Sequence, residues 1–399
     1  MKRRFVLVSV GRSDYGIYYP LLRAIEDDPE CELSVVVSGA HLSGLYGNTV
    51  KEFEADHIPI RDRVQMLLSG NSSEAVATSM GVGVINFANS FARLQADIII
   101  LLGDRFEMLA AAVAAVPLGI PIAHLHGGEV TEGAMDDSIR HAITKLSHIH
   151  FVAAPAYEQR VIQMGEQPGR VFLTGSPIVD AILAEPAISK DEIERELRIQ
   201  LDGALLITYH PVTLEKEQTK ERIAMLLDVL EKFDNELIFT YPNADMDSAV
   251  IIDQLNAFAK RVPRAHIFVN LGRFRYHALQ RYVAAMVGNS SSGILEASIF
   301  RLPVVNVGSR QKGRLRTPNI IDTPEEAKAI EAAIKRAISP DFRNSLSQMV
   351  NPYGQGDASR QILKVLKTVP LDGSLQKKAF YDLPPAGRPV DLVEKAQPG

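Results

Sequence analysis

One stretch of the chain concentrates side chains that could transfer protons or bind a metal. Residues 124–141, HLHGGEVTEGAMDDSIRH, hold three histidines, four acidic residues and three glycines. The apolar run MLAAAVAAVPLGIPIA comes directly before it, so the ionisable groups follow a predicted buried helix, turn and strand. Such crowding after a strand indicates a metal site, a catalytic acid/base cluster, or a polar loop without chemistry.

His124, His126 and Glu129 form the candidate metal site. Alternation along a strand would place the two histidines on one face, and His-x-His-x-x-Glu could chelate zinc or iron. The spacing is loose, however, and no cysteine or strong partner motif accompanies it. We therefore expect no bound metal.

Carboxylates at two strand ends favour acid/base chemistry instead. Asp104 ends the strand of LLGDR, and Asp136 and Asp137 open the predicted helix SIRHAITKLSH. Asp137 precedes Ser138 directly, so it could simply be the helix N-cap. Asp104 and Asp136 would converge on one site and supply the acid and the base for a proton transfer.

A second cluster has the composition of an anion site. VGNSSSGILEASIF, residues 287–300, predicts a strand, a small polar loop and a helix that begins near Ser292. Backbone N–H groups and hydroxyls of this loop would bind a phosphate, and Glu296 could accept hydrogen bonds from a ribose. The alternative is an ordinary N-cap cluster. The loop residues in question are Ser290, Ser291, Ser292 and Gly293.

Basic side chains could share the phosphate charge. Arg12 follows the first strand in VGRSDYG, and His210 ends another strand in ITYHPVT. Arg310 opens the basic run GSRQKGRLR after the strand PVVNVG, although such a run is also typical of a solvated loop. A lone histidine such as His210 could equally be structural.

The elements that must position these groups alternate between short apolar runs and amphipathic segments. That alternation predicts βαβ units around parallel sheets that are buried on both faces. Polar groups follow nearly every strand, so two such sheets would aim them into one interdomain cleft. We predict an α/β protein of two Rossmann-like parallel-sheet domains, like glycosyltransferase B. No G-x-G-x-x-G follows the first strand, so no dinucleotide cofactor is expected.

Four segments are expected along the chain. Pro177 and Pro186 flank a predicted linker near the division. The predicted segments are an N-terminal domain with the catalytic loops (1–178), a C-terminal UDP-binding domain (179–354), a C-terminal helix that returns to the N-terminal domain (355–385), and a disordered tail (386–399).

Composition excludes several classes of protein. The 399 residues are 46% hydrophobic and 23% charged, with a net charge of -5, so nucleic-acid binding is not expected. The apolar stretch 108–123 is too short for a membrane span, and the first apolar run is too short for a signal peptide. With a single cysteine, Cys31, the chain is predicted to be soluble and cytoplasmic, with no membrane partner.

Several motifs in order resemble the hydrolysing UDP-N-acetylglucosamine 2-epimerases of sialic-acid and legionaminic-acid biosynthesis. They are LLGDRFE, HLHGGEVTEGAMDDSIRHAITKLSHIHF, TYHPVT, VGNSSSGILEA and PVVNVGSRQKGR, and the similarity runs from VGRSDYG to KKAFYDL. No kinase domain follows, as expected for the stand-alone bacterial form.

The resemblance implies cleavage of UDP-N-acetylglucosamine by water to UDP and N-acetylmannosamine, through a glycal intermediate. It implies no cofactor, and a homodimer or homotetramer is expected. By the family's pattern the diphosphate is held by Arg12, His210, Ser290, Ser291 and Arg310, the ribose by Glu296, and the catalytic carboxylates are Asp104 and Asp136.

One position departs from that family pattern. Many relatives have a glutamate where this chain has His126. We expect His126 to be an acid/base or orienting group, because its reference pKa is near neutrality. Alternatively, Glu129 could fold back into the role of the missing glutamate.

Other activities remain open at this level. Enzymes that catalyse the same reaction on a UDP-2,4-diacetamido-2,4,6-trideoxyhexose share most of these motifs. A non-hydrolysing epimerase and a glycosyltransferase of the same fold are further alternatives. A non-enzymatic sugar-nucleotide sensor would leave the cluster of Asp104 and Asp136 without a purpose.

Overall fold

A computed structural model describes residues 2–43, 49–68, 72–131, 135–211, 218–242, 248–269 and 271–383. The predicted tail, 386–399, lies outside these residues. The described chain contains a seven-stranded and a six-stranded sheet, and all strand pairs in these two sheets are parallel. The predicted fold class, an α/β protein of two Rossmann-like domains, is confirmed.

The first sheet has the order β3-β2-β1-β4-β5-β6-β7. At its centre, Leu7 lies between Val35 on one neighbouring strand and Ile100 on the other. Every residue of β4, IIILL, is buried, as expected for a parallel strand covered on both faces. The strands are β1 (Arg3–Ser9), β2 (Cys31–Ser38), β3 (Ile60–Val64), β4 (Ile98–Leu102), β5 (Ile122–Leu125), β6 (Ile149–Val152) and β7 (Val171–Leu173).

The second sheet has the order β10-β9-β8-β11-β12-β13. Apolar side chains on its two faces form two separate core clusters, which helices cover from both sides. The strands are β8 (Leu205–Thr208), β9 (Leu237–Thr240), β10 (Ala265–Phe268), β11 (Ala285–Gly288), β12 (Val304–Val307) and β13 (Ile320–Thr323).

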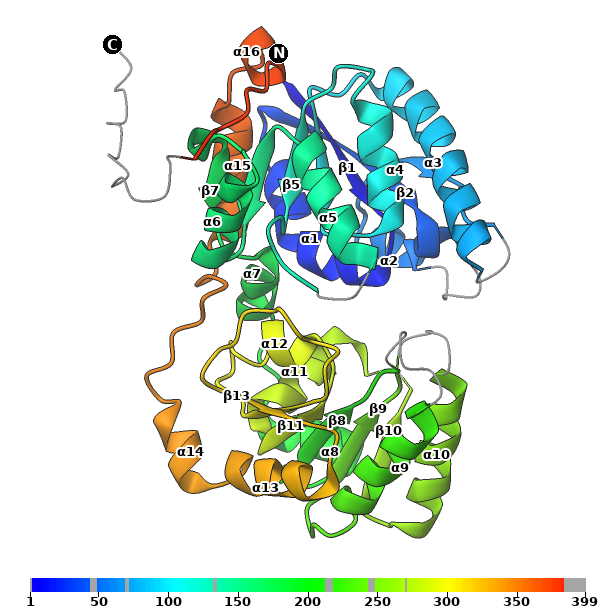
Figure 1. The fold of residues 1–399 in the computed structure, drawn as a ribbon, viewed down its shortest axis with the longest axis vertical. Helices are drawn as coiled ribbons and strands as arrows, with labels where there is room; N and C mark the ends of the chain where they lie inside the picture. The colour runs from blue at the N-terminus through cyan, green and yellow to red at the C-terminus, as the bar shows by residue number, and fades with distance from the viewer. Residues whose placement is uncertain are drawn as a thin grey trace.

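Helices connect the strands and fall into two groups that pack on the two sheets (Figure 1). The first group is α1 (Arg12–Glu26), α2 (Val50–Ala55), α3 (Ser73–Leu94), α4 (Phe106–Ala115), α5 (Met135–Leu146), α6 (Pro155–Gln163), α7 (Pro177–Ala184), α15 (Ala358–Thr368) and α16 (Gly373–Gln376). The second group is α8 (Lys190–Leu197), α9 (Thr219–Leu230), α10 (Ser248–Arg261), α11 (Gly272–Tyr282), α12 (Ser292–Leu295), α13 (Ala327–Ala337) and α14 (Pro340–Ser345).

After the second sheet, the chain returns to the first domain (Figure 1). Helix α15 packs against α1 and α7, and the guanidinium of Arg3 donates hydrogen bonds to the Leu366 and Val369 carbonyls at 2.6 and 2.8 Å. The predicted boundary after residue 178 falls within α7, which packs on the helices of the first sheet. The two ends of the described chain therefore build one domain.

The segment that follows α16 holds the end of α5. Lys378 Nζ donates hydrogen bonds to the carbonyls of Lys145 and Ser147, at 2.6 and 2.7 Å, where α5 ends. The same ammonium lies 2.7 Å from Glu166, whose carboxylate is buried and also contacts His150 at 3.0 Å. Opposite charges and helix carbonyls thus fix the C-terminal end of α5.

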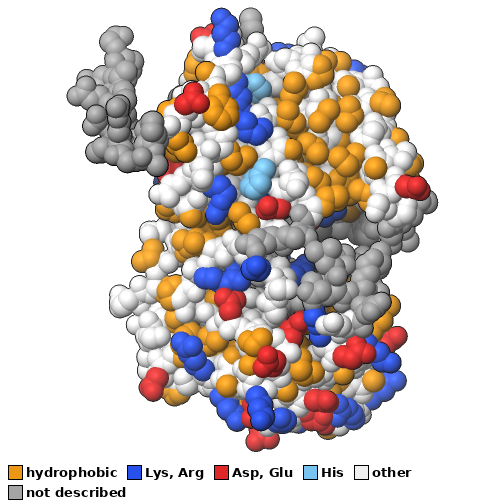
Figure 2. All heavy atoms as spheres, in the orientation of Figure 1, with side chains coloured by type: hydrophobic (Ala, Val, Ile, Leu, Met, Phe, Trp, Pro, Cys, Tyr) orange, Lys and Arg blue, Asp and Glu red, His pale blue; other side chains and the backbone are white. Residues whose placement is uncertain are grey.

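The outer face of α3 and α4 is apolar and exposed. The sequence predicts a buried helix, a turn and a strand over 108–123, and most of α4 is indeed buried. On its outer face, however, Val113 and Val116 are 40% and 45% exposed, and Ile85 on α3 is 63% exposed. Figure 2 shows this apolar area on the upper domain, over α3 and α4. By length and composition, α3 is one described helix that could cross a membrane, and 28% of its apolar window is buried.

Candidate active site

The strand order places the candidate residues at two topological switch points. In the first sheet the order reverses between β1 and β4, and in the second between β8 and β11. A crevice forms at such a point because the connections after the two strands leave toward opposite faces of the sheet. Arg12 and Asp104 follow the strands at the first switch point, and His210 and Ser290 follow those at the second.

Asp104 is held by a buried arginine that the sequence analysis missed. Arg140 Nη2 donates to Asp104 Oδ2, and its Nη1 donates to the Glu129 carbonyl at 3.0 Å. Arg140 is 2% exposed, and burial together with the charges of nearby arginines lowers its pKa to about 10. Arg140 lies four residues after Asp136 on α5, which places the two about one helical turn apart.

The two adjacent acids at the start of α5 have different environments. Asp137 Oδ1 accepts a hydrogen bond from the Thr131 backbone N–H at 2.7 Å and lies 3.4 Å from Arg140 Nη1. Asp137 is the third residue of α5, so it is not the N-cap considered from the sequence; its carboxylate bonds back to Thr131 instead. Asp136 lies on the first turn of α5 and is partly exposed.

His124 is a structural residue. Its Nε2 lies 2.8 Å from the Gly103 carbonyl and its Nδ1 lies 3.2 Å from Thr144 Oγ1. The side chain is fully buried, and this burial lowers the pKa of His124 to about 3. With both ring nitrogens against protein atoms, His124 is not available for the chelate considered from the sequence.

His126 does not share a strand face with His124, so that prediction was wrong. Strand β5 ends at Leu125, and His126 adopts φ +62°, a left-handed conformation that is uncommon outside glycine. Its Nε2 lies 2.9 Å from Ser176 Oγ, and its Nδ1 lies 2.9 Å from Glu129 Oε1. The imidazole is thus held between a hydroxyl and a carboxylate.

Glu129 connects the first domain to the second. Its Oε2 lies 3.9 Å from Nη1 of Arg314, in the loop between β12 and β13. Burial alone would raise the pKa of Glu129, but the contact with His126 Nδ1 and the charge of Arg314 lower it below its usual value. The neighbouring Leu315 N–H donates to the Tyr157 hydroxyl at 3.4 Å, so the same loop also contacts α6.

The polar loop after β11 requires a glycine and an asparagine. Gly288 has φ +137°, and a Cβ there would lie 2.0 Å from the Thr208 carbonyl of the adjacent strand β8. Asn289, which is fully buried, accepts the His210 backbone N–H at 2.7 Å and donates to the His210 carbonyl at 2.9 Å. These contacts join the two loops of the second switch point.

The serines of this loop bond to one another and to α11. Ser290 Oγ lies 2.9 Å from Ser292 Oγ, which lies 2.7 Å from the hydroxyl of Tyr276. Helix α12 begins at Ser292, as predicted, but it is one turn long. Its dipole is therefore small, so an anion at this loop would depend mainly on hydroxyls and local N–H groups. Gly293 packs against Val304, where a Cβ would lie 3.0 Å from the valine side chain.

The predicted basic residues separate in space. Arg310 Nη1 donates to the Asn289 carbonyl at 3.0 Å, beside the polar loop, whereas Arg316 pairs with Asp322 at 2.8 Å. His210 is buried, and burial together with the charge of Arg310 lowers its pKa to about 3. Arg12 is the first residue of α1, and its side chain lies outside the described part of the structure.

Glu296 has partners that sequence reasoning missed. It follows α12, and its Oε2 accepts a hydrogen bond from Gln280 Nε2 at 2.9 Å and lies 3.5 Å from His277 Nε2. His277 Nδ1 lies 2.7 Å from Glu185. Burial opposes a charge on His277, but the bonds to Glu185 and Glu296 outweigh it and raise its pKa to about 9. His277 therefore helps to orient the Glu296 carboxylate.

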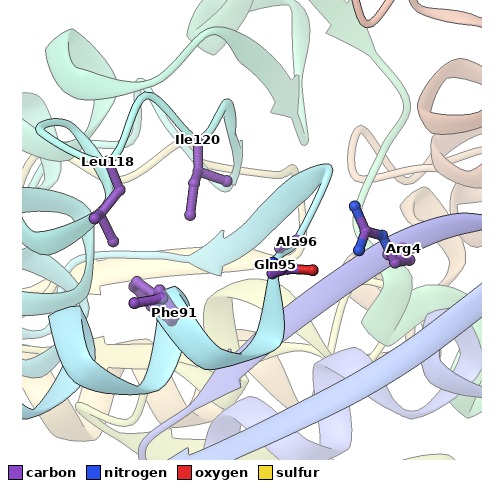
Figure 3. Close-up of a pocket in the computed structure, with 7 residues that line it drawn as sticks. Arg4, Phe91, Gln95, Ala96, Leu118 and Ile120 are labelled. Carbon is purple, nitrogen blue, oxygen red and sulfur yellow. The ribbon is translucent and has the colours of Figure 1, made fainter.

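A surface pocket at the opposite end of the strands of the first sheet is not the candidate active site. It lies at the amino ends of the strands, where Arg4 is the second residue of β1 and Ile120 precedes β5, whereas ligands of open parallel sheets bind at the carboxyl ends (Figure 3). Its lining residues are Arg4, Phe91, Ala92, Gln95, Ala96, Leu118 and Ile120.

The two sheets, with polar loops after the strands at each switch point, define a protein of two Rossmann-like domains. The model of the UDP-N-acetylglucosamine 2-epimerase family matches residues 23–367. The chain therefore belongs to that family.

Individual relatives cover nearly the whole chain. The GDP/UDP-N,N'-diacetylbacillosamine 2-epimerase (hydrolyzing) of Campylobacter jejuni is 40% identical over 386 residues, 96% of this chain and 100% of the relative. The UDP-N,N'-diacetylbacillosamine 2-epimerase (hydrolyzing) of Legionella pneumophila is 36% identical over 95% of this chain and 99% of its own length. The crystal structure of the Neisseria meningitidis UDP-GlcNAc 2-epimerase bound to UDP-GlcNAc matches with a TM-score of 0.80 at 17% identity, over 92% of this chain and all of that chain.

Proposed function

We propose that the protein is a hydrolysing 2-epimerase of a UDP-2-acetamido sugar. The observation that carries this proposal is the pairing of two switch points. One presents Asp104, Arg140 and the 126–129 loop, and the other presents the polar loop 289–292, while the Glu129–Arg314 contact joins the two domains. The proposed proton-transfer groups thus lie on the first domain, and the proposed anion donors other than Arg12 lie on the second.

The proposed reaction begins with loss of the C2 proton and departure of UDP from C1, which leaves a glycal. Water then adds to C1, and C2 receives a proton on the opposite face. Asp104 and Asp136 are the proposed proton carriers, because both side chains are partly exposed. His126 is assigned an orienting role, since Ser176 and Glu129 occupy its two ring nitrogens.

The second domain is proposed to stabilise the leaving group. Ser290, Ser291 and Arg310, together with Arg12 and His210, would bind the diphosphate, and fixed donors of this kind favour the charge that develops on UDP. The Glu296 carboxylate, oriented by His277 and Gln280, would accept the ribose hydroxyls. No metal or cofactor enters this scheme.

For the sugar, we propose UDP-N,N'-diacetylbacillosamine, a 2,4-diacetamido-2,4,6-trideoxyhexose nucleotide. The two relatives at 40% and 36% identity carry this substrate in their names. UDP-N-acetylglucosamine is the second candidate, because the UDP-N-acetylglucosamine 2-epimerase of Neisseria meningitidis is 32% identical over 84% of this chain and 88% of its own length.

Proton NMR in D₂O with EDTA tests both proposals. Each UDP-sugar is incubated with the protein, and the expected products are free UDP and the 2-epimeric free sugar with deuterium at C2. Faster turnover of the diacetamido substrate supports the proposed specificity, and faster turnover of UDP-N-acetylglucosamine replaces it with the second candidate. A UDP-linked epimer would instead indicate a non-hydrolysing epimerase. No reaction with either substrate would point to a transferase or to a binding protein.

We also propose that a second copy of the chain covers the exposed face of α3 and α4. No charged residue lies between Glu74 and Arg93 on α3, and both of these end residues are exposed. An antiparallel pair of α3 helices about a twofold axis would place the Glu74 end of each copy beside the Arg93 end of the other. We further propose that this homodimer is cytoplasmic. The single cysteine, Cys31, is a buried free thiol, which is consistent with a reducing compartment.

A further inference from the structure

Three buried side chains form a line from the interdomain junction to the acid/base loop. The junction is defined here as residues 175–176 and 353–354, where two segments far apart in the chain meet. Ser176 Oγ lies 2.9 Å from His126 Nε2, and His126 Nδ1 lies 2.9 Å from Glu129 Oε1. The three residues are 0%, 6% and 4% exposed.

The backbone of the junction fixes Ser176. Its N–H donates to the Tyr353 carbonyl at 2.7 Å. Gly175 has φ +81°, and a Cβ there would lie 2.7 Å from the same carbonyl and 3.0 Å from the Cα of Gly354. Because only glycine fits this approach, the position of the serine hydroxyl is set by the junction rather than by a mobile loop.

The serine, histidine and carboxylate have the order of a hydrolase triad, in which the serine attacks the substrate. Ser176 has no exposed surface, so a substrate carbon does not reach its oxygen. The remaining role is to orient His126. A carboxylate beside Nδ1 favours a proton on that nitrogen, which leaves Nε2 as an acceptor for the Ser176 hydroxyl proton.

We propose that Ser176 is a positioning residue, which holds His126 as the Nδ1–H tautomer and thereby holds Glu129 toward Arg314. The expected effect of Ser176 on turnover rests on the proposed epimerase function. Its expected effect on the tautomer of His126 does not. The left-handed backbone of His126, at φ +62°, is consistent with a ring held by contacts on both sides.

The test compares two alterations of neighbouring hydroxyls. Ser176→Ala removes the contact with His126. Thr174→Val is the matched control, because the Thr174 hydroxyl donates to the Gly175 carbonyl at 3.2 Å and is also buried. Ser176→Thr restores the hydroxyl. Histidine labelled with ¹⁵N reports the tautomer in each protein, with His126→Asn used to assign the resonance.

We expect the Nδ1–H form in the wild type and in Ser176→Thr, and a mixture of tautomers in Ser176→Ala. For turnover, Ser176→Ala should lower kcat by about tenfold with KM within about twofold, while Thr174→Val should stay close to the wild type. Equal losses in Ser176→Ala and Thr174→Val would overturn the proposal in favour of junction packing. An Nε2–H tautomer in the wild type would overturn it even if Ser176→Ala does not fold.

The tautomer measurement also separates this proposal from the proposed function. If the wild-type protein converts neither UDP-sugar, the epimerase proposal fails while the NMR result for His126 still decides the role of Ser176. If turnover is normal in Ser176→Ala and the Nδ1–H form persists, the epimerase proposal stands and the positioning role is overturned.

Discussion

Arg314 of the second domain lies 3.9 Å from the carboxylate of Glu129 in the first domain, and both side chains are largely buried. A carboxylate removed from water at this position needs a positive partner to stay ionised. Arg314 supplies this partner across the domain interface, in addition to the contact of Glu129 with His126. The charge state of the loop after β5 therefore depends on where the second domain lies.

Replacing Arg314 by Gln should raise the pKa of Glu129, because burial then acts with less opposition. We expect kcat/KM to fall by about tenfold, which is typical of lost support beside an active site. Steady-state assays of UDP release measure the effect. Arg261→Gln is the control, since Arg261 on α10 pairs with Glu231 at the end of α9 and contacts neither Glu129 nor Arg314. Equal losses in both variants would contradict a specific role for Arg314.

Asp104→Asn and Asp136→Asn should each reduce turnover by about 10²- to 10⁴-fold, the usual contribution of general acid–base catalysis. UDP is expected to bind either variant with a Kd within about threefold of the wild type, because the proposed UDP loop is on the other domain. Isothermal titration calorimetry with UDP, beside the rate assay, checks this. Loss of UDP binding would move the two carboxylates from catalysis to ligand binding.

The polar loop after β11 can be tested through nucleotide affinity. Ser290→Ala combined with Ser291→Ala should weaken UDP binding by about 10²- to 10⁴-fold, because each of the two hydroxyls, when bonded to a charged group, contributes about 1.5–3 kcal/mol. Ser345→Ala, on the exposed α14, serves as the control. An unchanged Kd for UDP in the double variant would refute the anion site.

Stability should be greatest near pH 6.5. Burial lowers the pKa of four histidines to about 3 or 4, so the folded chain keeps them neutral while the unfolded chain takes up protons below pH 6.5. They are His41, His124, His148 and His210. The Tm should therefore fall as the pH drops from 6.5 toward 4.

His277 acts in the opposite direction. Because its pKa is raised to about 9, its contribution is complete below pH 6.5 and is lost as the pH rises through 9. Thermal unfolding across pH 4 to 10 measures both limbs, and His277→Gln should flatten only the alkaline one. A Tm that does not change between pH 6.5 and pH 4 would contradict the neutral state of the buried histidines.

A charged substitution on α3 tests the proposed dimer interface. Ile85→Asp places a carboxylate at a site that is 63% exposed on α3, so it should leave the monomer folded and break the pairing. Light scattering coupled to size exclusion should show half the wild-type mass. Val269→Asp, at another exposed apolar position, should leave the mass unchanged. A monomeric wild type, or a dimeric Ile85→Asp, would refute this interface.

Much of the fold follows from the sequence because parallel strands that are buried on both faces appear as continuous apolar runs. The run ADIIILLGD predicts β4 directly, and its polar end marks the switch point. Edge strands β3 and β13 carry charged residues, as in IRDRV and IIDT, and have no such signature. Their existence depends on pairing with a neighbour rather than on their own composition.

The candidate site was only partly predictable for a similar reason. Residues that follow strands directly, such as Asp104 and Ser290, can be found from position alone. The missed residues lie within or before helices, and their roles come from contacts with residues far away in the chain. Arg140 contacts a residue 36 positions away, Ser176 one that is 50 positions away, and His277 residues 19 or more positions away. Such contacts appear only when the elements have packed.

The segment after α16, which contains Lys378, has a consequence for the order of biosynthesis. Lys378 reaches the end of α5 and the buried Glu166 only after the ribosome has made the entire six-stranded domain. Until then, the nascent first sheet lacks α15 and exposes the carbonyls at the end of α5. The N-terminal domain can therefore be completed only after every strand of the C-terminal domain has been synthesised.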